Sequence, residues 1–232
     1  MDHFKGVRPV DYSMSTTAKI DVVFRNHRDR LIEEIRRSPV VLGCVAWMTD
    51  EAILHALASC EHVNIIVQKE DFLRPDAGKW SRRLRQMYAD LPAPRSYVSL
   101  PGIADDLRGS DPRIAPRIDP VRCVGNHNRE RRPSWPRMHN KFLVFCDLGS
   151  GSVEETNSGG LEVTEPALTP RRVWTGSYNL SLAAKTSWEN AVLIENDEVA
   201  DAYASEFAQI TAFSEPLNWE NDWVAPEYRI RG

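Results

Sequence analysis

Hydrophobic and polar positions follow two patterns along the first ninety residues. Continuous apolar runs, typical of strands buried on both faces, occur at Val40 to Met48 and at Val63 to Gln68. A shorter run at Ile20 to Phe24 also predicts a strand. Charged stretches with apolar residues at helical spacing occur at Asn26 to Arg37 and at Ala77 to Leu91. This alternation predicts an α/β fold with a mixed, largely parallel β-sheet flanked by helices.

A further helix is expected between the two buried strands. Thr49 is a residue type that favours the N-cap position, and Asp50 and Glu51 would then lie in the first turn, where the helix dipole favours acidic side chains. We expect this helix to run to about Ser59.

The middle of the chain, from Pro92 to Pro136, is rich in proline, arginine and glycine and predicts a long loop. Two short apolar pieces within it, Tyr97 to Leu100 and Val121 to Val124, could form strands. A strong strand is predicted at Met138 to Cys146. The polar stretch from Gly149 to Gly160 has the composition of a flexible hairpin tip.

The last third of the chain returns to regular patterns. Leu161 to Thr164, Arg172 to Thr175 and Ala191 to Glu195 are predicted as strands, and Glu198 to Phe213 as a helix.

The composition is that of a globular protein, because 42% of the 232 residues are hydrophobic. The longest apolar runs fall far short of the roughly 18 residues that a membrane-spanning helix needs. The N-terminal residues Met1 to Gly6 are polar and lack the apolar stretch of a secretory signal. We therefore expect no membrane contact and a cytoplasmic location.

Metal ligands with a recognisable spacing are missing from the sequence. The 4 cysteines are scattered, and neither a Cys-x-x-Cys nor a His-Glu-x-x-His pattern occurs. We expect no metal site and no cofactor. The net charge of −4 conceals a concentration of arginines between residues 82 and 137, which favours an anionic partner.

The candidate chemistry lies in two short segments. On the strand predicted at 138–146, His139 and Lys141 are two residues apart and would share a face. After the strand predicted at 172–175, Gly176 permits a tight turn while Ser177 and Asn179 supply hydrogen bonds. An imidazole, an ammonium group and these polar side chains together suit a phosphate.

Each of these side chains has a chemical role in that hypothesis. The neutral imidazole of His139 can attack phosphorus and form a covalent intermediate. Lys141, Asn179 and Ser177 would stabilise charge on the phosphoryl oxygens in the transition state. Glu189 can orient an imidazole by accepting its other N–H. A second histidine is needed to protonate the leaving oxygen and then to activate water.

These residues resemble the signature of the phospholipase D superfamily, His-x-Lys followed by Gly-Ser-x-Asn, present here as His139-Asn140-Lys141 and Gly176-Ser177-Tyr178-Asn179. Trp188 to Val192 is similar to the family's acidic segment after the second half, and Ala46 to Asp50 to an early strand-to-helix step. The resemblance covers about residues 20 to 213. It implies a metal-independent phosphodiesterase that works through a phosphohistidine.

The resemblance also organises the chain into parts. Residues 1–18 are expected to form an N-terminal tail, 19–214 a phospholipase D-like catalytic domain with loops at 92–137 and 148–170, and 215–232 a C-terminal tail.

One position departs from the family pattern. Members usually carry an aspartate five residues after the lysine, where this chain has Cys146, and Asp147 comes one residue later. A shift of one residue turns a side chain to the other face of a strand unless a bulge intervenes. This puts a role for Asp147 in doubt.

The chain holds one copy of the motif, whereas the mechanism needs two histidines on opposite sides of the phosphorus. The resemblance implies a symmetric homodimer in which His139 of each subunit meets at a two-fold axis, because small single-motif members of the family work in this way.

Residues outside the motif favour nucleic acid, DNA or RNA, as the substrate of an endonuclease, since basic and aromatic side chains lead directly into the catalytic strand. A phospholipase D-type lipid enzyme remains an alternative, although no membrane-docking stretch is evident. A non-catalytic nucleic-acid-binding module is a third. His127 is expected to be a surface residue or a substrate contact. The candidate substrate-binding residues are Arg122, Arg129, Arg131, Arg132, Arg137 and Trp135.

Overall fold

The computed structural model describes residues 19–74, 76–93, 119–150, 152–155, 161–164 and 168–226. The predicted N-terminal tail and the short strand expected at Tyr97 to Leu100 lie outside these residues.

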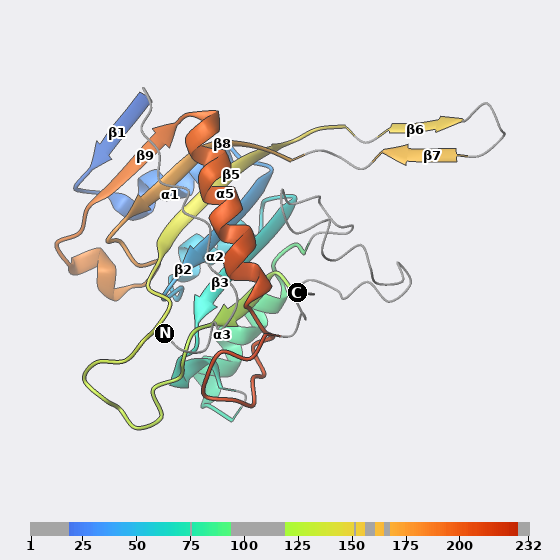
Figure 1. Ribbon diagram of the computed structural model, residues 1–232. Coiled ribbons are helices and arrows are strands. Elements are labelled where there is room, and N and C mark those ends of the chain that lie inside the picture. The colour runs from blue at the N-terminus through green and yellow to red at the C-terminus, as the bar shows by residue number, and fades with distance from the viewer. Residues whose placement is uncertain are drawn as a thin grey trace.

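A seven-stranded sheet in the order β1-β9-β8-β5-β2-β3-β4 forms the centre of the fold (Figure 1). Its strands are β1 (Lys19–Val23), β2 (Val40–Val45), β3 (His62–Gln68), β4 (Val121–Val124), β5 (Lys141–Leu148), β8 (Leu168–Gly176) and β9 (Ala191–Glu195). Every strand predicted in the described residues is therefore present, with boundaries shifted by a few residues.

The predicted mixed sheet flanked by helices is confirmed, but its strands are not largely parallel. Within the described sheet, β2, β3 and β4 are parallel to one another, while the pairings β1–β9, β9–β8, β8–β5 and β5–β2 are antiparallel. Parallel neighbours need a long crossover, usually a helix, and the chain supplies helices between β2 and β3 and between β3 and β4. From β5 to β9 it supplies a hairpin and a short 3₁₀ helix, so these strands run back and forth.

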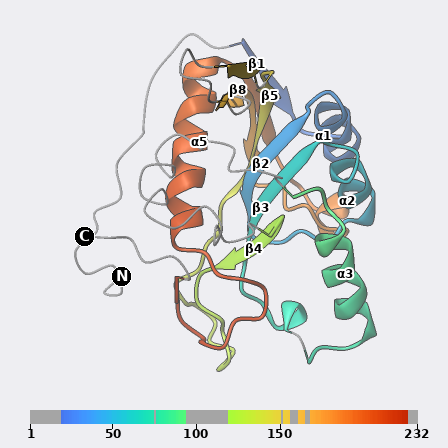
Figure 2. The same cartoon turned by 90° about the vertical axis from the view of Figure 1, so that its right-hand side faces the viewer.

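Helices cover both faces of the sheet (Figure 2). On one face lie α1 (His27–Arg36), α2 (Glu51–Leu57) and α3 (Lys79–Ala89), and on the other lies α5 (Asp197–Ala212). Each face has its own apolar core, one including Leu31 and Leu54, the other including Phe207. The sheet is thus the middle layer of three.

Strand β2 is buried along its whole length, as its unbroken apolar run predicts. Val41 and Val45 pack into the core beneath α1 and α2, and Leu42 and Cys44 into the core beneath α5. Between them, Gly43 allows β5 to approach closely, because a Cβ at this position would lie 2.5 Å from the backbone oxygen of Phe142.

Two details of local structure differ from expectation. The N-cap of α2 is Asp50, whose side chain accepts a hydrogen bond from the Ala52 backbone at 2.9 Å, and not Thr49. The strand expected from Met138 begins only at Lys141, so His139 precedes it.

Four short elements of the chain are not part of the seven-stranded sheet. The polar insertion forms a two-stranded sheet of β6 (Ser152–Glu155) and β7 (Leu161–Thr164) that lies away from the seven strands in Figure 1. Single 3₁₀ turns, η2 (Asp71–Leu73) and η3 (Ala183–Thr186), follow β3 and β8.

The described part of the predicted C-terminal tail, residues 215–226, packs against the domain. Glu215 forms an isolated antiparallel bridge with Cys123 of β4, and Trp219 packs against the core beneath α1 to α3. The Lys69 ammonium, at the end of β3, donates to the backbone oxygens of Asn221 and Trp223 at 3.0 and 2.7 Å. This segment, here named the C-terminal strap, therefore closes one end of the sheet.

Candidate active site

The register of the central strands brings the two halves of the motif together. Lys141, the first residue of β5, lies opposite Val45 of β2. The next residue, Phe142, lies opposite Thr175 of β8, so Lys141 adjoins Gly176 and the turn that follows. The candidate site therefore lies at one end of β5 and β8, in the middle of the sheet.

His139 lies two residues before β5, in a segment without regular structure. Its ring meets the edge of the Trp47 indole, with the ring centres 5.7 Å apart and the planes at 78°. The Asn140 backbone oxygen accepts from Ala46 N at 2.9 Å, which anchors this segment to the residues that follow β2. The imidazole is thus held beside the sheet although it is not part of a strand.

The charge state of His139 suits a nucleophile. Partial burial lowers its pKa, and the positive charges of Lys141 and Arg137 lower it further. A neutral imidazole is the form that can attack phosphorus.

Lys141 is half-buried, and its ammonium group donates to the His139 backbone oxygen at 2.9 Å. Burial and Arg137 lower the pKa of Lys141, while the carboxylate of Glu189 raises it. The charges of Arg137 and Glu189 thus act on the pKa of Lys141 in opposite directions.

Two hydrogen bonds join the turn after β8 to Asn190, the residue before β9. The Ser177 backbone N–H donates to the Asn190 oxygen at 2.9 Å, and the Asn190 N–H donates to Ser177 Oγ at 3.0 Å. A Cβ on Gly176 would lie 2.2 Å from the same Asn190 oxygen, so glycine is needed for this close approach. The Ser177 hydroxyl in turn donates to the carboxylate of Glu189.

Two residues of this turn, Tyr178 and Asn179, differ in their contacts. Tyr178 is buried and stacks on His27 of α1, with ring centres 5.0 Å apart and planes at 12°. The Oδ1 of Asn179 is buried and meets no hydrogen-bond partner among the described residues.

Glu189 was predicted to orient an imidazole, and within the described residues its hydrogen-bond partner is the Ser177 hydroxyl. The His139 ring makes no hydrogen bond to another described residue. The Glu189 carboxylate thus accepts a hydrogen bond from Ser177, and its charge raises the pKa of Lys141.

The prediction that Arg122 binds substrate is wrong. Its side chain is only 1% exposed, and its guanidinium donates to Ser214 Oγ at 2.7 Å and to the Ser214 backbone oxygen at 3.1 Å. Because it points into the protein from β4, it joins that strand to the end of α5. A buried charge held by such contacts is a structural feature.

Three other arginines predicted to bind substrate have exposed side chains. Arg129 lies 3.4 Å from the carboxylate of Asp222, and Arg132 donates to Glu130 at 2.7 Å. Arg131 occupies a left-handed turn with φ 52°. These side chains share the loop that precedes His139, and within the described part of the chain no hydrogen bond or ion pair joins them to the motif residues.

Arg137 is the predicted arginine that lies in the neighbourhood of His139. Its Cζ lies 4.5 Å from the centre of the Trp135 ring and 5.7 Å from that of Trp47. Both distances are within the range of cation–π contacts. The structure thus connects two predicted substrate contacts, Arg137 and Trp135, with His139 through Trp47.

Gln68 was not predicted to have a role at this site. This fully buried residue ends β3, and its amide N–H groups donate to the backbone oxygens of Asn126 at 2.7 Å and Lys69 at 2.9 Å. Its Oε1 accepts from Met138 N at 2.8 Å. One side chain therefore holds both ends of loop 126–138 and fixes the residue next to His139.

The next two residues support the same region. Lys69 has no exposed surface and forms an ion pair with Glu215 of the C-terminal strap. Glu70 accepts from Trp47 Nε1 at 2.9 Å, and burial raises its pKa. The run Gln68-Lys69-Glu70 after an apolar strand was the available signal, since polar residues at a strand end commonly carry function.

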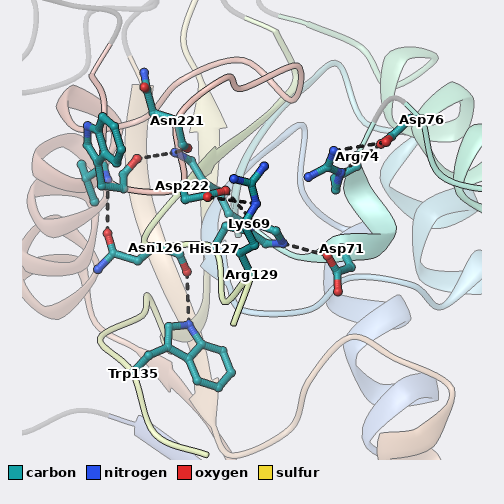
Figure 3. A network of polar contacts seen from close by, with 12 residues as sticks. Lys69, Asp71, Arg74, Asp76, Asn126, His127, Arg129, Trp135, Asn221 and Asp222 are labelled. Atoms are coloured by element: carbon teal, nitrogen blue, oxygen red, sulfur yellow. Dashed lines mark hydrogen bonds and ion pairs between the residues drawn. The ribbon is translucent and has the colours of Figure 1, made fainter. Parts of the chain in front are cut away.

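His127 is not the surface residue that was expected. It is 8% exposed, and its two ring nitrogens lie 2.8 Å from Asp71 and 2.9 Å from Asp222, as Figure 3 shows. It therefore joins η2 to the C-terminal strap. In the same view, Asn126 accepts from the Trp135 indole, which extends the polar network into the loop before His139.

Asp147 lies far from the motif. The register of β5 and β8 shifts between Phe145 and Cys146, as a bulge would produce, and Cys146 is buried in the core under α5. Asp147 pairs with Arg171 at 2.9 Å on the surface. Six residues of extended strand separate it from Lys141, about 20 Å.

The described residues were also compared with the requirements of a metal site and of a membrane-spanning helix. No group of three or more His, Cys, Asp or Glu side chains among them is arranged to hold a metal ion. In the same part of the chain, no helix has both the length and the apolar character that crossing a membrane requires.

Comparison with known sequences identifies one relative. No family profile matches the chain. The uncharacterized protein L381 of Acanthamoeba polyphaga mimivirus is 31% identical over 207 residues, which cover 85% of this chain and 67% of the viral protein. The chain belongs to the L381 family. Its membership alone assigns no activity.

Comparison with solved structures finds remote similarity. The chain is similar to a phospholipase D family member, Nuc from Salmonella typhimurium, with a TM-score of 0.49, 14% identity, and coverage of 86% of this chain and 97% of that one. It is also similar to NucT from Helicobacter pylori, with a TM-score of 0.48, 14% identity, and coverage of 85% and 98%. The functional argument for this member of the L381 family rests on its own site residues.

Proposed function

We propose that the chain is a phosphodiesterase of the phospholipase D type that hydrolyses nucleic acid without a metal ion. The observation that carries the proposal is the meeting of His139, Lys141, Ser177 and Asn179 at one end of β5 and β8, with Glu189 beside them. These are the groups that a covalent displacement at phosphorus needs, and they come from two segments more than thirty residues apart.

The first step would be attack of the neutral His139 imidazole on phosphorus. A nitrogen–phosphorus bond forms, the bond to the leaving oxygen breaks, and that oxygen takes a proton from a second imidazole. In the second step this imidazole removes a proton from water, the water oxygen attacks phosphorus, and His139 is released. The burial and positive charge that lower the His139 pKa keep the attacking imidazole neutral.

The phosphoryl oxygens would be held by Lys141 and by the turn after β8. Asn179 carries amide N–H groups that would donate to a phosphoryl oxygen. Ser177, fixed by Glu189 and by Asn190 N–H, sits in the same turn. Donors held in place in this manner stabilise developing charge without reorganising.

The second imidazole would come from His139 of a second copy of the chain in a homodimer. This part of the proposal is supported by apolar side chains exposed next to the motif: Leu182, 59% exposed, follows Asn179 by three residues, and Trp188, 87% exposed, immediately precedes Glu189. Large exposed apolar side chains beside a site are typical of an interface. A two-fold axis there would bring the two sites together.

The proposed activity is tested by incubating the protein in EDTA with single-stranded DNA, double-stranded DNA, RNA and phospholipid vesicles. Cleavage of a nucleic acid by the natural chain, lowered roughly a thousandfold or more in His139→Ala, is expected. Strict dependence on a divalent metal would contradict the mechanism. Release of lipid head groups with no nucleic-acid cleavage would favour the phospholipase alternative, and inertness toward every diester would favour a binding module.

The homodimer is tested with Leu182→Glu. A charge in an apolar interface should convert the dimer to a monomer in light scattering and abolish cleavage while leaving the circular dichroism spectrum unchanged. A natural chain that is monomeric and fully active would exclude the shared site. Leu148→Glu offers a control, because Leu148 is half-buried at the opposite end of β5.

A further inference from the structure

Three side chains form a continuous column that leads to the nucleophile, named here the aromatic–arginine column. It consists of Trp135, Arg137 and Trp47. The guanidinium carbon of Arg137 lies 4.5 Å from the Trp135 ring centre and 5.7 Å from the Trp47 ring centre. The Trp47 ring centre is in turn 5.7 Å from that of the His139 ring.

Both indole rings of the column are held by their N–H groups. Trp47 Nε1 donates to Glu70 at 2.9 Å. Trp135 Nε1 donates to the Asn126 backbone oxygen at 3.1 Å, and Figure 3 shows this second contact. Asn126 is itself fixed, since its backbone oxygen accepts from Gln68 and its side-chain oxygen accepts from Val224 N at 3.2 Å. The N–H edge of each indole ring therefore faces the protein. Because both side chains are already held in place, ligand binding would not have to immobilise them.

Arg137 carries a positive charge that no described carboxylate neutralises by a direct ion pair. Its side chain is exposed, whereas the exposed Arg129 and Arg132 in the same loop are paired with Asp222 and Glu130. Its charge also lowers the pKa values of His139 and Lys141, which agrees with its position beside the reacting groups. Among the described residues, the guanidinium has no carboxylate partner, so its N–H groups can bind a phosphate. The indole rings beside it can contact the bases on either side of that phosphate.

We propose that the aromatic–arginine column is the binding platform for single-stranded nucleic acid, with an unpaired base stacked on Trp135 and Arg137 bound to a phosphate adjacent to the one that His139 attacks. The proposal rests on the proposed function and specifies its substrate class. In a duplex the faces of the bases are covered by their neighbours, so only an unpaired base can stack on an indole ring. A lipid head group offers no flat π-face to match the rings.

The test measures binding to protein that carries His139→Ala, so that no substrate is consumed. The ligands are a fluorescent oligothymidylate, an abasic strand of the same length and charge, the corresponding duplex, and anionic phospholipid vesicles. Addition of Trp135→Ala should weaken oligothymidylate binding about tenfold, since one stacking contact is lost, and leave the abasic strand unaffected. Addition of Arg137→Gln should weaken both strands and reduce the slope of log affinity against log salt by about 0.7.

Matched control variants separate the column from general effects of charge and aromatic content. Trp80→Ala removes a 52% exposed tryptophan on α3, and Arg36→Gln removes an exposed arginine from the last turn of α1. Neither should alter binding. Equal loss from Trp135→Ala on oligothymidylate and on the abasic strand would overturn the stacking, and tighter binding of duplex or vesicles than of single strands would overturn the substrate class.

A small chromogenic phosphodiester distinguishes this proposal from the proposed function. It has no neighbouring base or phosphate, so its hydrolysis reports on the motif residues without the column: the natural chain should hydrolyse it, and His139→Ala should not. Hydrolysis that survives His139→Ala would refute the proposed function. Normal strand binding by both Trp135→Ala and Arg137→Gln, with hydrolysis dependent on His139, would refute the column alone.

Discussion

Replacing Gln68 by methionine removes the clamp on loop 126–138 while keeping nearly the same side-chain volume. The variant loses the hydrogen bonds to the backbone oxygens of Asn126 and Lys69 and the one accepted from Met138 N. The Asn126 backbone oxygen keeps the hydrogen bond from the Trp135 N–H, but the buried Met138 N–H loses the Gln68 oxygen, its partner among the described residues. We expect a loss of about 2–4 kcal/mol in the free energy of unfolding, because each bond contributes about 1 kcal/mol and an orphaned donor costs more.

This loss should lower the melting temperature by roughly 4–16 °C for a chain of this size. The effect on activity should be larger than stability alone explains. Met138 precedes the nucleophile, and a displacement of about 1 Å at a reacting group costs on the order of a hundredfold in rate. Far below its melting temperature, Gln68→Met should therefore show a kcat reduced about a hundredfold.

Asn64→Leu is the matched control for this experiment. Asn64 is a buried amide on the same strand, and its side chain donates to the Asp119 backbone oxygen at 3.0 Å, at the other end of β3. It should change the melting temperature without changing kcat. Equal kcat values for Gln68→Met and the natural chain, measured by oligonucleotide cleavage, would refute the reasoning that the clamp positions His139.

For three further substitutions, the structure predicts the direction in which a pH profile or the stability should change. Arg137→Gln removes a charge that lowers the His139 pKa, so this pKa should rise and the acid limb of the kcat/KM profile should move to higher pH; an unmoved limb would contradict the assignment. Glu189→Gln removes the carboxylate that raises the Lys141 pKa, so the alkaline limb should move to lower pH, and a shift upward would count against it. Gly43→Ala places a methyl group 2.5 Å from atoms of β5 and should destabilise the protein by about 1–3 kcal/mol in urea unfolding, whereas an unchanged midpoint would show that the strands can separate without cost.

The elements could be predicted wherever local pattern decides the structure. The apolar run at Val40 to Val45 is continuous because β2 is covered on both faces, and that property is visible in the sequence. Strand direction is not local. The residues of β5 and β8 do not indicate that the two strands pair antiparallel. Strand direction depends on the connection, since parallel neighbours need a long crossover, usually a helix.

The motif residues of the site could be predicted, and their supports could not. His139 and Lys141 belong to a short pattern, whereas Gln68 acts through Asn126, 58 residues later in the chain. Arg122 was misassigned for the same reason, because an arginine in a short strand can point either way and its burial depends on Ser214, 92 residues away. Long-range contacts of this kind appear only when the fold is assembled.

The central claim is that His139 becomes covalently attached to the phosphoryl group. The direct measurement is the mass of the protein after brief acid-quenched reaction with an oligonucleotide in EDTA, followed by peptide mapping. The account predicts an adduct on the peptide that contains His139, present in the natural chain and missing in His139→Ala. Cleavage of the oligonucleotide with no adduct at any time in the first turnover, or an adduct on a different residue, would contradict it.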